Sequence, residues 1–142
     1  MNTRDFANRH NIGAYVLRIN KRPDIDMDAW EKTARHWLVV LHRVVDGSPG
    51  SPIHAEAHTY YSQGPAHRKP PSAADVLDSL ASDIASVRSA RDFEDWCSDM
   101  GVDPDSRKWF ACYERIFETQ KSLLRLLGSS LLDELVEKTE RL

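Results

Sequence analysis

The chain has 142 residues, of which 41% are hydrophobic and 29% charged, a composition typical of one folded domain rather than of a disordered chain. Its net charge is −3, too small to indicate a polycation or polyanion, but residues 1–70 carry +3 and residues 71–142 carry −6. No window approaches the ~20 apolar residues of a membrane-spanning helix, and no apolar run resembles a secretion signal, so we expect neither membrane insertion nor secretion.

The first half predicts a small antiparallel β-sheet. Alternating apolar residues favour a strand over 14–19, and a short helix over 27–35 with Asp26 as its N-cap is allowed. Residues 36–45 are rich in β-branched and aromatic side chains and are followed by the turn-forming run DGSPGSP. A second strand over 54–62 would complete a hairpin with them. The proline-rich segment 64–71 then ends the sheet.

The second half, residues 71–142, predicts helices only. Apolar residues recur at helical spacing in four segments: 73–87, 90–100, 104–127 and 130–140. The fold class expected from both halves is therefore α+β, with residues 1–142 as a single domain whose residues 1–70 are mainly β and whose residues 71–142 are helical.

Capping signals set these helix boundaries. Ser72 is expected to cap the first helix together with Asp75, and Ser89 to cap the second. Gly101 is placed to end the second helix, and Asp103 followed by proline to begin the third. In that third helix we expect one apolar stripe facing the core, made of Trp109, Cys112, Ile116, Gln120, Leu123, Leu124 and Leu127.

The sequence contains no convincing catalytic motif. Cys97 and Cys112 are the only cysteines, and both fall at apolar helical positions without the Cys-x-x-Cys spacing of redox or zinc sites. This usage favours a reduced, cytoplasmic setting. No Gly-x-Ser-x-Gly elbow or phosphate-binding loop is present, and acids such as Asp92, Asp95 and Asp99 are typical of a solvated helix face. We therefore expect a protein that is not an enzyme and has no catalytic residues.

All six histidines lie in the first half of the chain, which raises a metal hypothesis. His54 and His58 would share one face of a strand, as would His36 and His42 on its neighbour, so a zinc or nickel site between the strands is geometrically allowed. We expect no carboxylate or thiolate beside them at ligand spacing, and such histidines are typical of a solvent-facing strand. No metal and no cofactor are expected.

Basic residues are too scattered to indicate direct nucleic-acid binding. One alternative is an accessory nucleic-acid-binding protein of a mobile element that uses the hairpin side, through His36, Arg43, Tyr60, Arg68 and Lys69. A metal-binding protein or an enzyme built on the histidine-bearing sheet is the weaker alternative.

A concentrated acidic stretch lies between residues 72 and 105, where nine acids oppose only Arg88 and Arg91 and give −7. Carboxylates spaced along helices could imitate phosphates and occupy a basic nucleic-acid channel, although a merely solvated surface is the simpler interpretation of any one of them. The candidate partner-binding residues are Asp75, Asp78, Asp83, Asp92, Glu94, Asp95, Asp99, Asp103 and Asp105.

Several blocks of the chain also resemble a known family. In order they are HWLVVL, TYYSQGPAH, AADVLDSLASD, ARDFEDWCSDMG and DPDSRK. Their order and spacing over about residues 36–128 resemble a family of small uncharacterised proteins encoded by bacteriophages, prophages and other mobile elements. In this resemblance His36-Trp37, Ser62-Gln63-Gly64 and His67 occupy family positions, whereas the longer hairpin loop and residues 1–35 are departures.

The resemblance implies a setting of phage against host rather than a mechanism, because the family has no assigned catalytic residues. Together with the acidic stretch, it leads to the hypothesis of a non-enzymatic inhibitor of host defence in the cytoplasm of a bacterial cell. The specific form is an anti-CRISPR protein that binds a type I CRISPR–Cas surveillance complex; another defence protein is the alternative partner. The four tryptophans, Trp30, Trp37, Trp96 and Trp109, also allow a homodimer.

Overall fold

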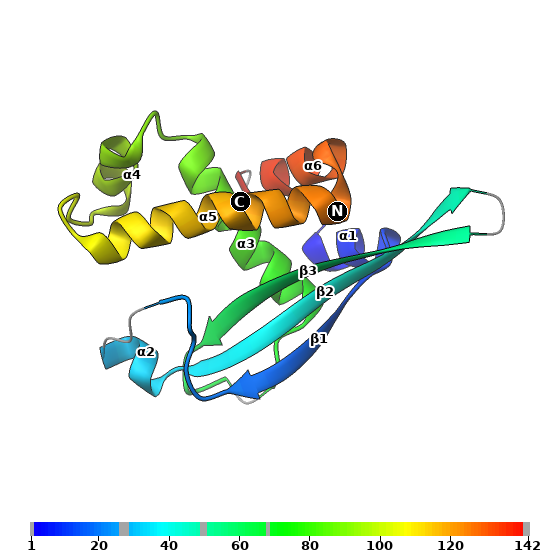
Figure 1. Ribbon diagram of the computed structural model, residues 1–142, viewed down its shortest axis with the longest axis horizontal. Coiled ribbons are helices and arrows are strands. Elements are labelled where there is room, and N and C mark those ends of the chain that lie inside the picture. Colours follow the sequence, from blue (N-terminus) through cyan, green and yellow to red (C-terminus); the bar gives the residue numbers. More distant parts are fainter. Residues whose placement is uncertain (1, 26–28, 49–50, 68, 141–142) are drawn as a thin grey trace.

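The computed structural model describes residues 2–25, 29–48, 51–67 and 69–140, which form an α+β fold (Figure 1). Within these ranges there are three strands in one antiparallel sheet, and six helices. In chain order the elements are α1 (Thr3–Arg9), β1 (Ile12–Ile19), α2 (Ala29–Thr33), β2 (Arg35–Ser48), β3 (Ser51–Gln63), α3 (Ala73–Arg88), α4 (Phe93–Met100), α5 (Arg107–Leu127) and α6 (Ser129–Glu140).

The sheet has the order β1-β2-β3, with β2 in the centre. The β2–β3 hairpin is longer than the sequence predicts, because pairing continues to Ser48 and Ser51 with an irregularity between Asp46 and Ser48. The glycine- and proline-rich run was expected to be a loop. Pro52 is nevertheless compatible with β3, since proline is tolerated on an edge strand. The hairpin extends beyond the helices (Figure 1).

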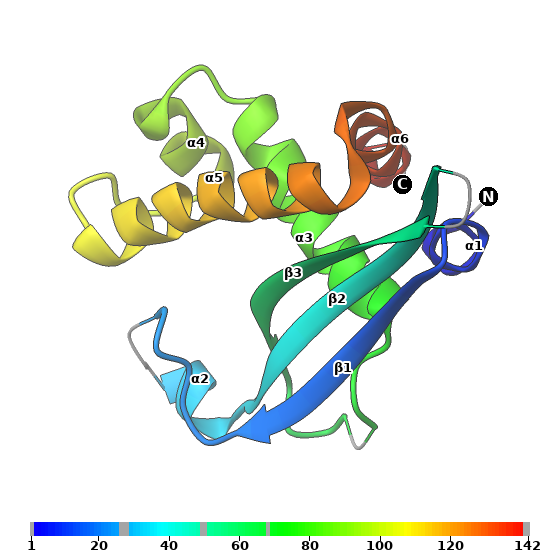
Figure 2. The same ribbon diagram turned by 45° about the vertical axis from the view of Figure 1, so that its right-hand side comes forward.

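One face of the sheet is covered by helices. Trp37, Val39 and Leu41 alternate along β2 toward this face and are at most 7% exposed. They join Ile12 of β1 and Ala57 of β3 in a core shared with α1, α3, α5 and α6. Figure 2 shows α3, α5 and α6 on this side of the sheet, whereas α2 lies at the end of the strands. The core therefore combines both halves of the chain.

Large side chains on the other face of the sheet remain exposed. Tyr15 and Leu17 of β1 are 70% and 63% exposed. The His42 ring contacts that of Tyr15 in a tilted arrangement, with 4.6 Å between ring centroids, and it lies over Gly13. A Cβ at position 13 would come within 2.5 Å of the His42 ring. Glycine is therefore required there for His42 to keep this position.

Two of the predicted caps are confirmed. Ser72 and Asp75 form a reciprocal capping box at the start of α3, and Gly101 ends α4 with φ +71°. The predicted start of α4 is wrong: Asp92, not Ser89, is its N-cap. Ser89 instead ends α3, where its N–H donates to the carbonyl of Ala85.

The remaining boundary differences have local causes. α5 begins at Arg107 rather than at residue 104, because a turn closes first: Asp103 accepts from the backbone N–H of Asp105, and the N–H of Ser106 donates to the carbonyl of Asp103. Asp26, the cap expected for the short helix α2, lies outside the described residues.

Leu124, expected in the buried stripe of α5, is 44% exposed.

α1 was not predicted. Its seven residues are too few to show helical periodicity, but Asn2 caps it by accepting from the N–H of Asp5, and Phe6 is fully buried. Burial of one aromatic side chain against the rest of the fold thus fixes a helix with a weak local signal.

An aromatic cluster joins α4 to α5. Trp96 is 1% exposed and donates from Nε1 to Ser86 Oγ at 3.0 Å. Its ring lies 5.4 Å from that of Tyr113, and Phe93 packs against both residues. The short α4 is therefore anchored by its aromatic residues, which leaves its polar residues at the surface.

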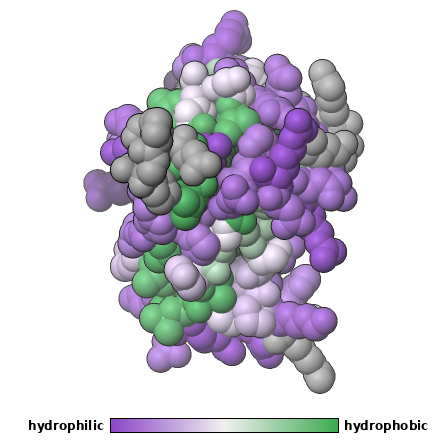
Figure 3. All heavy atoms as spheres, turned by 90° about the vertical axis from the view of Figure 1, so that its right-hand side faces the viewer, coloured by the Kyte–Doolittle hydropathy of each residue, from purple (hydrophilic) through white to green (hydrophobic). Residues whose placement is uncertain are grey.

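Hydrophilic side chains cover most of the molecule where it is viewed from the hairpin side, and apolar groups reach the surface in separate patches (Figure 3). None of the described helices is long and apolar enough to cross a membrane.

Candidate functional site

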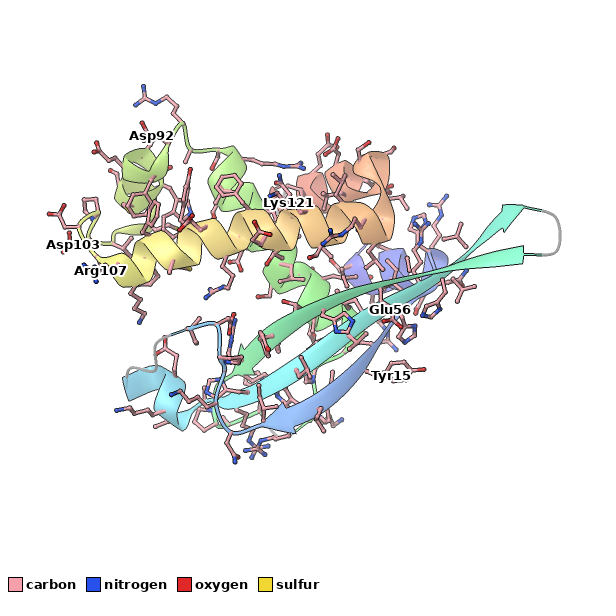
Figure 4. All side chains as sticks on the ribbon, viewed as in Figure 1. Tyr15, Glu56, Asp92, Asp103, Arg107 and Lys121 are labelled. Atoms are coloured by element: carbon pink, nitrogen blue, oxygen red, sulfur yellow. The ribbon has the colours of Figure 1, made fainter. Side chains whose placement is uncertain are left out.

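The densest group of carboxylates lies at one end of the molecule, on α4 and the turns on either side of it. Figure 4 shows Asp92 and Asp103 at this end, before and after α4. We call this group the acidic end; its members are Asp92, Glu94, Asp95, Asp99, Asp103 and Asp105.

Half of the acidic end is held in place by backbone hydrogen bonds. Asp92 Oδ1 accepts from the N–H of Asp95 at 2.9 Å, and Asp95 Oδ2 accepts from the N–H of Arg91 at 3.0 Å. Asp103 Oδ1 accepts from the N–H of Asp105 at 2.9 Å. These three carboxylates are therefore fixed by local structure, and Asp92 and Asp95 also favour the N-terminal end of α4 electrostatically.

The other half of the acidic end is exposed and takes no part in the capping bonds of the described residues. It consists of Glu94, Asp99 and the side chain of Asp105. The cations at this end are fewer than its six acids. Arg91 lies 3.8 Å from Asp95, and Figure 4 shows Arg107 beside Asp103, whereas Lys108 pairs with Glu31 at 3.4 Å. The acidic end therefore keeps a strong negative charge toward solvent.

The three remaining candidate acids lie elsewhere, on α3. Asp75 belongs to the capping box, and Asp78 accepts a hydrogen bond from the Thr3 hydroxyl of α1. Burial, together with the charges of Asp75 and Asp78, raises the pKa of Tyr61 on β3, which places both acids beside the sheet. Asp83 lines a cleft. The nine acids thus do not form one continuous surface.

A cleft of about 470 Å³ lies between the edge strand β3 and α5. Burial raises the pKa of Asp83 in this cleft, against the opposing charges of Arg115 and Arg22. An adjoining hollow of about 330 Å³ lies closer to α2. Both are lined by Arg22, Asp24, Ser62 and Arg115.

An ion-pair bridge divides the cleft from the hollow. Arg22 Nη2 lies 2.7 Å from Asp24 Oδ2, and Arg115 Nε of α5 lies 3.5 Å from the same oxygen. Burial by itself would raise the pKa of Asp24, but the Arg22 hydrogen bond and the two positive charges outweigh it and hold that pKa below its usual value. The bridge ties the loop after β1 to α5.

His36 and Ser62 meet beside this bridge. Ser62 Oγ lies 2.8 Å from His36 Nδ1, and the other ring nitrogen, Nε2, contacts the backbone carbonyl of Glu31. A carbonyl can only accept, so Nε2 carries the proton and Nδ1 accepts from the Ser62 hydroxyl. Arg22 Nη1 donates to Ser62 Oγ at 3.1 Å.

A serine hydroxyl that donates to an imidazole nitrogen is also the arrangement found in enzymes, where the serine is the nucleophile and the histidine is its general base. Here His36 is 2% exposed, and burial, followed by the charge of Arg22, lowers its pKa and keeps the ring neutral. Its contacts join β2, β3 and α2. Beside it, Trp37 Nε1 donates to Gln63 Oε1 at 3.0 Å in the core. The pairs His36–Ser62 and Trp37–Gln63 hold the start of β2 against the end of β3.

Two other histidines of the metal hypothesis, His54 and His58, have a partner that the sequence interpretation overlooked. Glu56 lies between His54 and His58 on the same face of β3, with Nε2–Oε distances of 3.0 and 3.5 Å. The statement that no carboxylate stands beside them is therefore wrong. Among the described residues, no group of three or more His, Cys, Asp and Glu side chains is placed to hold a metal ion.

The residues of the nucleic-acid alternative do not share one surface. His36 is buried, and Arg43 turns to the helical side, where it donates to the carbonyls of His10 and Leu126. Tyr60 lies under Arg22, with 5.9 Å between the guanidinium carbon and the ring centroid. Lys69 is exposed, and Arg68 lies outside the described residues.

No protein-family model, curated protein or solved structure matches the chain.

Proposed function

We propose that the protein is a non-enzymatic, phage-encoded inhibitor of a host defence system that acts in the cytoplasm of a bacterial cell. Its specific form is an anti-CRISPR protein that binds a type I CRISPR–Cas surveillance complex. The observation that carries the proposal is the acidic end, where Asp92, Asp95 and Asp103 are fixed by backbone hydrogen bonds.

Fixed carboxylates suit the imitation of a nucleic acid. A protein that guides or binds nucleic acid offers a basic channel to phosphates, and a rigid group of negative charges can enter such a channel without first being ordered. Only six of the nine candidate acids belong to the acidic end, so the proposed binding residues are the six acids between residues 92 and 105.

The structure separates acids that can be replaced safely from acids that hold α4. Reversal of Asp92 or Asp95 would remove a cap and weaken the fold, so a loss of binding would be ambiguous. A triple variant with Glu94, Asp99 and Asp105 replaced by lysine changes the charge without removing a carboxylate that accepts one of these capping bonds.

The test is copurification of the protein with a purified type I surveillance complex. Wild-type protein is expected to bind, and the triple lysine variant to lose at least about tenfold in affinity, because buried or channel-bound charges contribute strongly to association. The control replaces three exposed acids outside the acidic end, Asp5, Glu56 and Glu137, by lysine and should bind like the wild type. Failure of the wild-type protein to bind such complexes, or equal binding by both triple variants, would contradict the proposal.

A further inference from the structure

α5 presents a row of apolar side chains to solvent. Phe110, Phe117 and Leu124 stand seven residues apart and are 47%, 38% and 44% exposed. At about 1.5 Å per residue the row is about 21 Å long. Ile116 and Leu123, each one residue before a member of the row and so about 100° around the helix from it, are buried in the core. In both ribbon views α5 crosses in front of α3 (Figures 1 and 2).

The aromatic members of this row are held rigidly although they are exposed. The Phe110 ring meets Phe93 of α4 edge-on at 5.1 Å, and the Phe117 ring meets Tyr113 in the same way at 5.0 Å. Rigid aromatic side chains lose little conformational entropy on association, which is why they are enriched at the centres of interfaces.

Two opposite charges flank the row on one side. Glu114 and Lys121 each follow an apolar member of the row by four residues, so they lie on the same edge of it. Both are exposed. Within the described part of the chain Glu114 pairs with no cation, and Lys121 meets only Glu118, at 3.3 Å on the open surface.

We propose that this face of α5 binds the same face of a second copy of the chain in antiparallel orientation. A two-fold axis through Phe117 would set Phe110 against Leu124 of the second copy. The same axis brings Glu114 opposite Lys121 of the second copy, and this pair occurs twice by symmetry. In a parallel arrangement, two-fold symmetry would put the Glu114 and Lys121 edges of the two copies on opposite sides of the interface, and neither pair would form. The charges therefore favour the antiparallel orientation.

The contact is small. One pair of helices over about 21 Å buries less than the roughly 800 Å² per partner of a standard stable interface. The dimer therefore depends on protein concentration and dissociates on dilution. The surface is distinct from the acidic end and does not rest on the function proposed above.

Sedimentation equilibrium across protein concentrations up to about 1 mM tests the dimer. Glu114→Lys and Lys121→Glu are each expected to weaken association roughly tenfold or more, because each turns two attractive pairs into two repulsive ones. The double variant Glu114→Lys/Lys121→Glu restores both pairs with reversed sign and should dimerise again. Phe117→Lys, at the axis, should remain monomeric.

Glu137→Lys makes the same charge change on an exposed position of α6 and is the matched control; it should dimerise like the wild type. Circular dichroism of every variant checks that the helices are intact. A wild-type protein that stays monomeric at the highest concentration would overturn the proposal. So would a dimer that persists in the single reversals, or a double variant that fails to recover association while its helices are intact.

Discussion

His36 is the buried side chain whose ionisation matters most for the sheet. Its ring nitrogens are occupied by Ser62 and the carbonyl of Glu31, and both contacts suit the neutral ring. Burial lowers its pKa. Protonation would place a charge in the interior and remove the acceptor that Ser62 uses.

The stability of the protein should therefore fall in mildly acidic solution. A histidine with a depressed pKa contributes stability that is present above its unfolded pKa of about 6.5 and is lost as the pH falls through the lower, folded value. His10, whose pKa burial also lowers, adds to the effect with the same sign. Urea unfolding at a series of pH values measures the slope.

The variant His36→Asn separates the contribution of His36 to the pH dependence of stability from that of His10. The variant should be less stable by about 1–3 kcal/mol at neutral pH, because partners of a buried polar group are left unsatisfied. Its free energy of unfolding should vary less with pH than that of the wild type, since only His10 still titrates in this way. A variant with an unchanged pH slope would show that His36 is not responsible.

At the scale of the element, helix caps decide where the α-helices begin. Ser72→Ala should destabilise the protein by about 1 kcal/mol, because the N–H of Asp75 loses its acceptor. Asp92→Ala should have a similar cost at the start of α4. Ser89→Ala is the control with a smaller effect, since the bond that ends α3 uses its backbone N–H and the side chain loses one exposed bond, to the carbonyl of Ser86 at 3.2 Å. Chemical unfolding of the three variants distinguishes a cap at Asp92 from one at Ser89.

The helices also show which local sequence signals are sufficient to predict where a helix begins or ends. Ser72, Asp75 and Gly101 could be predicted because a capping box and a left-handed C-terminal glycine are encoded within four residues. Ser89 and Asp92 are both good caps, and the choice between them depends on how Phe93 and Trp96 pack against α5, which local sequence does not specify. The hydrophobic pattern likewise gave the strands, but not their extension through the glycine- and proline-rich run.

At the scale of the whole molecule, Asp24 connects segments that are far apart in the sequence. It lies between Arg22, in its own loop, and Arg115 of α5, and no sequence motif pairs residues 24 and 115. The cleft beside it was missed for the same reason. By contrast, the family-like positions His36 and Ser62 were noted in the sequence, but their contact required the strand register.

Asp24→Asn should lower the free energy of unfolding at neutral pH by about 1–2 kcal/mol, because two guanidinium groups lose a charged acceptor. The sign of the pH effect follows from the depressed pKa of Asp24. The stabilisation is present above the unfolded pKa of about 4 and is lost as the pH falls through the lower, folded value. The difference between wild type and variant should therefore shrink in acid, which urea unfolding at neutral and acidic pH measures. Glu137→Gln, at an exposed position of α6, should show no such difference.

The contact between Gly13 and the His42 ring couples two positions that are distant in the sequence. A methyl group at position 13 would occupy the space of the ring, and the tilted ring contact of His42 with Tyr15 would be lost with it. A side chain at 13 requires either that the His42 ring turns away or that position 42 carries a shorter residue. Among related sequences that keep this sheet, the two positions should therefore change together, glycine accompanying a large ring and larger residues accompanying small ones.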